Sequence, residues 1–350
     1  MMKKSRIEWT WCVSGFYGCI GERYTNSLLD TPHVSADVPT PPVSYLGTDG
    51  HDRWLMLLRG ELHNAPLENP QEILDLGTGT GIWALDMAEY DLPFHPRLSN
   101  RTPNTNRKFP EAHIIGTDID PIQPSWTLPN LEFIIENLED EWLYKKNHFD
   151  YIHARLLAMC VADWPLLIRR MYEHTKPGGY CEHQESAIWA WSDDGSLTYD
   201  SPVFQHVQAL DTAARLTGRE LNIYYKLRGW MIDAGFEDVK EYTYFLPYSP
   251  WPRDPHLKEL GKYQAVMAQQ AVESYGLRLC TQVLGWGVEP SKIFQAMVKR
   301  HLRDKHLHAY LKVYVHSPFS FVSRFLQSVS PDGARAVLIL LGLRSTDGNR

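Results

Sequence analysis

Three glycines alternate in the segment ILDLGTGTGIW, residues 73–83, directly after a short apolar stretch. Glycine adopts backbone angles that other residues avoid and lets a ligand approach the main chain, so Gly77, Gly79 and Gly81 indicate a ligand-binding loop. A strand before this loop and a helix after it would place the loop at the carboxyl edge of a parallel sheet, where open α/β folds bind their ligands. The N-terminus of the following helix would favour an anionic group.

Three kinds of ligand suit a loop of this type. A phosphate-binding P-loop requires a Gly-Lys-Ser/Thr ending, which is absent here, so phosphoryl transfer is set aside. A nicotinamide dinucleotide site prefers the spacing G-x-G-x-x-G, whereas the spacing in this loop is G-x-G-x-G. S-adenosylmethionine is the third candidate, because its carboxylate and ribose can bind such a loop without a pyrophosphate. The loop by itself leaves the last two ligands open.

An acidic residue is expected about 20 residues after the loop, at the end of the second strand, where its carboxylate binds ribose hydroxyls. The candidate, Asp118 in IIGTDID, instead lies 37 residues after Gly81. The intervening segment 91–107 contains three prolines and three asparagines and has no helical or strand period. Without those 17 residues the separation is 20, so we predict that Asp118 is the ribose acid and that 91–107 is an insertion.

Strand and helix patterns alternate along the rest of the chain, which is typical of a parallel sheet with crossover helices. Strands are expected at 72–76, 113–117, 131–135, 149–153 and 180–185, from 236, and at 308–316. Helices are expected at 51–63, 82–90, 164–174, 204–216, 223–234, 257–284 and 292–303. The predicted fold class is α/β, with a seven-stranded, mostly parallel sheet and late helical insertions that form a lid.

Composition excludes several classes of function. The net charge is −7, and lysines and arginines never occur more than two in a row, as at Lys3–Lys4, so direct binding to nucleic acid is not expected. The five cysteines include no C-x-x-C pair, which indicates neither a zinc site nor a disulfide framework. Glu8 interrupts the only candidate signal peptide, and the late apolar run Ala336–Leu343 is too short to span a bilayer. We therefore expect a protein with no membrane association and no metal, located in the cytoplasm.

Five segments together resemble the LaeA-like family of fungal class I methyltransferases. These segments are ILDLGTGTGIWALDMA, IGTDIDPIQPSW, NLEDEW, FDYIHAR and DWPLLIRRMYEHTKPGGY, and the similarity extends from about His51 to Val315. The resemblance implies a Rossmann-like class I methyltransferase fold with S-adenosylmethionine as the methyl donor. It implies methylation of an oxygen or nitrogen atom on a small molecule of fungal secondary metabolism. The alternative that it leaves open is a nuclear, LaeA-like regulator that acts in a complex with protein partners.

The resemblance also implies a set of cofactor-binding residues in three groups. Five would contact the methionine end, two would meet the ribose and adenine, and two would lie at the adenine edge. In that order they are Asp75, Gly77, Thr78, Gly79 and Gly81; Asp118 and Ile119; and Asn137 and Leu138.

The sulfonium of the donor is already activated, so the protein mainly aligns the acceptor with the methyl group and keeps water out. A general base helps when the acceptor is a hydroxyl or a protonated amine. His153 is the predicted catalytic base because it ends a sheet strand; it and Arg155 would lie near the methyl group. His183 and Glu185 on the fifth strand are weaker candidates, and a structural role is the alternative for either histidine.

The chain is predicted to have four parts. Residues 1–50 form an irregular N-terminal segment, 51–190 the cofactor-binding core with its insertion, 191–316 the remaining strands and the helical acceptor lid, and 317–350 a tail that is atypical of the family. One hypothesis for both the insertion and the tail is translated intron sequence. The other is a genuine surface loop and tail, which proteins tolerate because closing a longer loop costs little.

Overall fold

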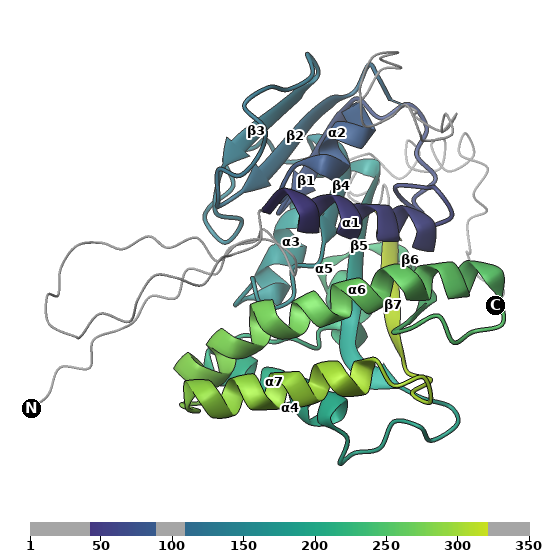
Figure 1. The fold of residues 1–350 in the computed structure, drawn as a ribbon. Coiled ribbons are helices and arrows are strands. Elements are labelled where there is room, and N and C mark those ends of the chain that lie inside the picture. Colours follow the sequence, from purple (N-terminus) through teal and green to yellow (C-terminus); the bar gives the residue numbers. More distant parts are fainter. Residues whose placement is uncertain (1–42, 89–108, 321–350) are drawn as a thin grey trace, which may run out of the picture.

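The structure is a computed structural model in which residues 43–88 and 109–320 are described (Figure 1). The helices are α1 (Val43–Leu57), α2 (Ile82–Ala88), α3 (Trp164–His174), α4 (Pro202–Leu216), α5 (Tyr224–Ala234), α6 (Pro255–Arg278), the π-helical turn η1 (Leu279–Val283) and α7 (Val288–Leu302). The strands are β1 (Glu72–Leu76), β2 (His113–Asp118), β3 (Leu131–Ile135), β4 (Phe149–Arg155), β5 (Thr175–Trp191), β6 (Glu237–Pro247) and β7 (Tyr310–Phe319).

The described strands form one sheet in the order β3-β2-β1-β4-β5-β7-β6. β1, β2, β3, β4 and β5 run parallel, and β7 pairs antiparallel with both β5 and β6. This confirms the predicted seven-stranded, mostly parallel α/β sheet. The order reverses at β1 and β4, and ligands of doubly wound sheets bind outside the carboxyl ends of the strands at such a point.

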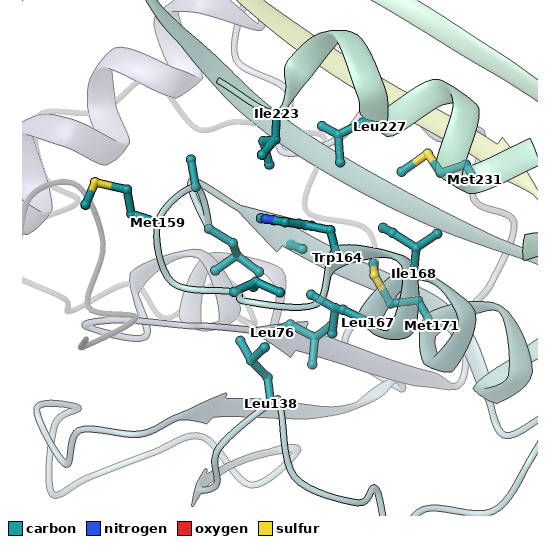
Figure 2. Close-up of a cluster of buried hydrophobic side chains, with 14 of the residues drawn as sticks. Leu76, Leu138, Met159, Trp164, Leu167, Ile168, Met171, Ile223, Leu227 and Met231 are labelled. Atoms are coloured by element: carbon teal, nitrogen blue, oxygen red, sulfur yellow. The ribbon is translucent and has the colours of Figure 1, made fainter. Parts of the chain in front are cut away.

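Both faces of the sheet are buried, and side chains that alternate along the strands enter two separate layers of core. Leu74 and Leu76 of β1 pack in the layer that includes α3 and α5, whereas Ile73 packs with Trp83 of α2. Figure 2 shows part of the first layer, in which Trp164 lies among side chains from α3 and α5. Because side chains alternate across a strand, Asp75 must face the same side as Ile73, toward α2.

Local sequence explains where α3 and α5 begin or end. The Asp163 carboxylate accepts a hydrogen bond from the N–H of Leu166 at 3.0 Å, which caps the start of α3. Gly235 ends α5 with a φ of 109°, a left-handed conformation that glycine adopts without steric cost. The ranges expected for both helices from the sequence, 164–174 and 223–234, agree with the observed bounds within a residue.

Several predicted boundaries differ from the structure. α1 begins at Val43, inside the segment 1–50 that was expected to be irregular, and it ends at Leu57. β5 is longer than the predicted 180–185, because the KPGG segment continues the strand instead of turning before it. The expected helix 257–284 divides into α6 and η1. The insertion 91–107, residues 1–42 and 321–350 lie outside the described residues, and the division at residue 190 stays a prediction.

The helices α4, α6 and α7 pack on one another and on η1, and α6 also packs on α1 and β6 (Figure 1). A β-carbon on Gly276 of α6 would lie 2.8 Å from both His206 of α4 and Gln295 of α7. The late helical segments therefore form one closely packed group, which we call the α4–α6–α7 cover. Arg53 of α1 donates a hydrogen bond of 2.5 Å to Gln264 of α6, linking α1 to this cover.

Candidate cofactor site

The glycine loop follows β1 in a conformation that its glycines permit. Gly77, Gly79 and Gly81 have φ values of 66°, 58° and 76°, all in the left-handed region that disfavours residues with a β-carbon. The loop is closed by hydrogen bonds from the Thr78 N–H to the Thr117 carbonyl oxygen (2.8 Å) and from the Gly81 N–H to the Thr78 carbonyl oxygen (3.0 Å). The alternate spacing of the three glycines thus matches three left-handed backbone positions.

Gly81 has a second constraint, which comes from packing. A β-carbon at this position would lie 2.3 Å from the ring of Phe133 on β3, and one at Gly116 of β2 would lie 2.9 Å from the same ring. Gly81 therefore lets Phe133 pack under the loop. This contact explains the need for glycine at residue 81 without any ligand, and its predicted contact with the cofactor stays a prediction.

Asp75 is the polar centre beneath the loop. It is 2% exposed. One of its carboxylate oxygens accepts a 2.6 Å hydrogen bond from the Thr78 hydroxyl, and the other lies 2.7 Å from Nδ1 of His153. Asp75 and His153 are register partners on β1 and β4, so the strand pairing places their side chains next to each other. Asp75 thereby connects the glycine loop to β4.

His153 is enclosed by its neighbours. Its ring stacks on the indole of Trp83 with a centroid distance of 3.8 Å and an angle of 3°, and its side chain is 1% exposed. Burial lowers the pKa of His153 below its ordinary value, and the hydrogen bond to Asp75 opposes that shift. The structure thus gives His153 a structural partner on each side. Its predicted role as the base that reaches the acceptor stays a prediction.

Asp118 lies at the end of β2, beside the loop. Its carboxylate oxygens accept hydrogen bonds from the N–H groups of Gly79 (2.8 Å) and Asp120 (3.0 Å). Burial raises the pKa of Asp118 to about 6, and these backbone hydrogen bonds oppose the shift. The structure therefore brings the distant acid to the glycine loop, as the spacing argument requires, and Ile119 follows as a partly buried residue.

Asn137 and Leu138 form the turn after β3. The Asn137 side-chain oxygen accepts a hydrogen bond from the Glu139 N–H at 3.1 Å, which holds the turn. The Leu138 side chain is part of the core shown in Figure 2, and its carbonyl oxygen accepts a hydrogen bond from the Trp142 indole at 3.0 Å. The side chain of Leu138 is thus committed to packing, and the predicted contact of Asn137 and Leu138 with the adenine edge stays a prediction.

Sequence reasoning missed the role of Glu182. This residue is fully buried, and its carboxylate accepts hydrogen bonds from the N–H groups of Asn64 (2.8 Å) and Ala65 (2.8 Å). Gln184, two residues along β5, donates to Glu182 at 2.8 Å and to the Leu62 carbonyl oxygen at 3.1 Å. Burial raises the pKa of Glu182 to about 7. Polar residues at alternate positions of a central strand were the available signal, because such a strand is otherwise apolar.

The weaker candidates His183 and Glu185 face the other side of β5. The His183 ring meets Trp164 edge-on at 5.4 Å, and burial lowers its pKa. The Glu185 carboxylate accepts a hydrogen bond from the Ala158 N–H at 3.1 Å, and burial raises its pKa to about 8. These two residues are therefore separated from Asp75 and His153 by the sheet.

Comparison with known proteins is informative at this point. Residues 52–241 match the family model described as a methyltransferase domain. The chain is 35% identical to methyltransferase pytC of Aspergillus terreus over 260 residues. This aligned region covers 74% of this chain and 75% of that protein. It is 30% identical over 272 residues to the secondary metabolism regulator LAE1 of Cochliobolus heterostrophus, covering 76% and 83%. The chain belongs to this methyltransferase family.

The family assignment agrees with the sheet order and confirms the resemblance seen in the sequence, including its LaeA-like character. A further relative is the probable methyltransferase tdiE of Emericella nidulans, 30% identical over 269 residues that cover 76% of this chain and 78% of that protein. Within 43–88 and 109–320, the methyltransferase has no helix long and apolar enough to cross a membrane. The same residues contain no group of three or more side chains suited to hold a metal ion.

Proposed function

We propose that this methyltransferase binds S-adenosylmethionine at the glycine loop and transfers its methyl group to an oxygen or nitrogen atom of a small molecule of fungal secondary metabolism. The observation that carries the proposal is the joining of the glycine loop to the acid of β2, with the Gly79 N–H donating to Asp118 at 2.8 Å. The family and the fungal methyltransferases among its relatives support the reaction class.

The residues present fit this cofactor. Gly77 and Gly79 have positive φ values that disfavour other residues, and they present no β-carbon where the methionine end would lie. The buried Asp118 carboxylate supplies acceptors for the ribose hydroxyls, and Ile119 supplies an apolar contact for the adenine. At the adenine edge, Asn137 holds the turn that presents the backbone of Leu138.

When bound, S-adenosylmethionine supplies a methyl group on an activated sulfonium, so the chain mainly has to align the two reactants. We assign Asp75 and His153 to positioning. The hydrogen bond from His153 fixes one oxygen of Asp75, and the Thr78 hydroxyl occupies the other, which holds the loop against β4. The α4–α6–α7 cover, together with α1, would enclose the acceptor and exclude water.

Methyl transfer can be measured directly. The purified protein would be incubated with S-adenosylmethionine and a panel of small phenols, alcohols and amines, and the formation of S-adenosylhomocysteine would be followed. The expected result is acceptor-dependent formation of this product, reduced at subsaturating donor concentration when Asp118 is replaced by alanine. A protein that binds the donor and transfers to none of these acceptors would contradict the small-molecule half of the proposal.

The similarity to LAE1 favours a second candidate, a regulator of secondary metabolism. Removal of the gene from its host separates the two functions. If the protein is a small-molecule methyltransferase, its removal should leave one compound without its methyl group and should not change the transcripts of unrelated gene clusters. A regulator should change the transcripts of many clusters at once.

A further inference from the structure

Arg155 lies where the cofactor loop begins. Leu76 and Ala154 are the last register partners of β1 and β4, so Arg155 is the next residue on β4, at the level where the loop after β1 begins. Its side chain points to the same face as His153, two residues earlier. There it contacts α1, with its guanidinium 5.6 Å from the centre of the Trp54 ring and 3.3 Å from Nδ1 of His51.

The contact with His51 fixes the orientation of the guanidinium. Arginine has only donors, so Nδ1 of His51 must be the acceptor. The proton of the neutral imidazole is then on Nε2, which donates to the Asp86 carboxylate of α2 at 2.9 Å. This chain of contacts, from Asp86 through His51 to Arg155, holds the arginine between α1 and α2 and uses one of its five N–H donors.

The charge of Arg155 has no direct carboxylate partner among the described residues, because no carboxylate oxygen lies within 4.0 Å of its guanidinium. The carboxylates of Asp75 and Asp86 raise the pKa of Arg155 through their charge, without contacting its guanidinium. Asp75 is engaged by His153 and Thr78, and Asp86 is engaged by His51. Other arginines in the structure do form such pairs, for example Arg215 with Asp211 at 2.9 Å.

An enclosed positive charge without a paired anion is costly. Burial lowers the pKa of Arg155 to about 10, and the neighbouring charge of Arg53 adds to this effect. Arg155 as a whole is only partly buried. Planar guanidinium groups bind carboxylates through two parallel hydrogen bonds. A carboxylate ligand would therefore complete the site.

We propose that Arg155 binds the carboxylate of the amino-acid part of the methyl donor, with His51 as the residue that positions it. This inference rests on the proposed function, which places the methionine end of the donor beside Gly77 and Asp75. It adds a side-chain partner for the carboxylate, so that donor recognition involves β4 and α1 as well as the loop after β1.

The test compares two ligands that differ in this group. S-adenosylhomocysteine has the amino-acid carboxylate, and 5′-methylthioadenosine lacks the amino-acid part. Calorimetric titration of both into the wild-type protein, Arg155→Met and Arg155→Lys gives a ratio of the two affinities for each protein. Arg215→Met is the matched control, because it removes an exposed arginine of α4.

The expected result is a loss of about ten- to a hundredfold in S-adenosylhomocysteine affinity for Arg155→Met, the usual effect of losing a charge-assisted hydrogen bond. Its affinity for 5′-methylthioadenosine should stay within about twofold, which also shows that the site is folded. Arg155→Lys should lose less because it keeps the charge. The inference would be overturned if Arg155→Met lost affinity for 5′-methylthioadenosine as much as for S-adenosylhomocysteine. It would also be overturned if its affinity for S-adenosylhomocysteine did not fall. Wild-type protein that binds neither ligand would overturn the proposed function instead.

Discussion

The cofactor half and the α4–α6–α7 cover both depend on glycine, for different physical reasons. We call β1 to β4, α2 and the glycine loop the cofactor half, after the function proposed for it. In the loop after β1, Gly77 and Gly79 are required by positive φ values within a few residues of sequence. In the cover, Gly261 and Gly276 lie within the helix α6, and a β-carbon on either would collide with atoms outside that helix. A short motif therefore encodes the cofactor half, whereas tertiary contacts alone encode the need for glycine in the cover.

Gly81→Val should have the largest effect. The new side chain would need a φ of 76° and would overlap the Phe133 ring, so the free energy of unfolding should fall by roughly 2–5 kcal/mol. Urea denaturation measures this change. Gly229→Val is the matched control, because a β-carbon on this α5 glycine meets nothing within 4 Å and the change should be small. Equal stability of the two variants would show that the loop tolerates a side chain at residue 81.

Asp118→Ala should weaken S-adenosylmethionine binding by roughly 1–3 kcal/mol, because the ribose hydroxyls and the Gly79 N–H lose their acceptor. Titration calorimetry gives the affinity. Asp163→Ala serves as the control, since it removes the cap of α3 and should lower stability without changing donor affinity. Unchanged affinity in Asp118→Ala would contradict the assignment of the ribose site.

Donor affinity should depend on pH through the same carboxyl group. The pKa of Asp118 is raised to about 6, so the group is protonated below that pH and can no longer accept from both hydroxyls. Affinity should fall roughly tenfold from pH 7 to pH 5 in the wild type and stay flat in Asp118→Asn. Because the folded protein holds this proton more tightly than the unfolded chain, wild-type stability should also decline relative to Asp118→Asn as pH rises from about 4 to 6. A parallel pH dependence in both proteins would refute this origin.

Gly261→Ala should have the smallest effect. It should lower stability without changing donor affinity, which distinguishes the cover from the cofactor half. Its β-carbon would lie 2.4 Å from the Ser249 carbonyl oxygen, so α6 must shift, and part of that cost is offset by the better helix propensity of alanine. We expect a loss of about 1 kcal/mol in denaturation experiments and an unchanged affinity for the donor. If donor affinity fell as far as in Asp118→Ala, the cover and the cofactor half would not be separable.

The glycine loop could be recognised from the sequence because its signal is local: the spacing of Gly77, Gly79 and Gly81 matches three left-handed residues. Spacing also predicted that Asp118 ends the second strand, and it does so beside the loop. Its contact with ribose stays a prediction. The pairing of Asp75 with His153 was not predicted. It depends on the register of β1 against β4, which places side chains 78 residues apart in contact.

Contacts between distant segments could not be predicted from the sequence. The fully buried Glu182 holds the segment after α1, and Gln264 of α6 binds Arg53. The sequence around Glu182 or Gln264 contains no local pattern from which its partner could be predicted. The start of α1 at Val43 was also missed, because its N-terminal part contains two glycines and no regular apolar period.

The most direct test of the account is titration of the purified protein with S-adenosylmethionine and, separately, with NADH. The account predicts binding of S-adenosylmethionine at micromolar concentrations, weakening of that binding by roughly 1–3 kcal/mol in Asp118→Ala, and no binding of NADH. Binding of NADH without S-adenosylmethionine, or binding of S-adenosylmethionine that does not depend on Asp118, would contradict the assignment of the glycine loop as a methyl-donor site.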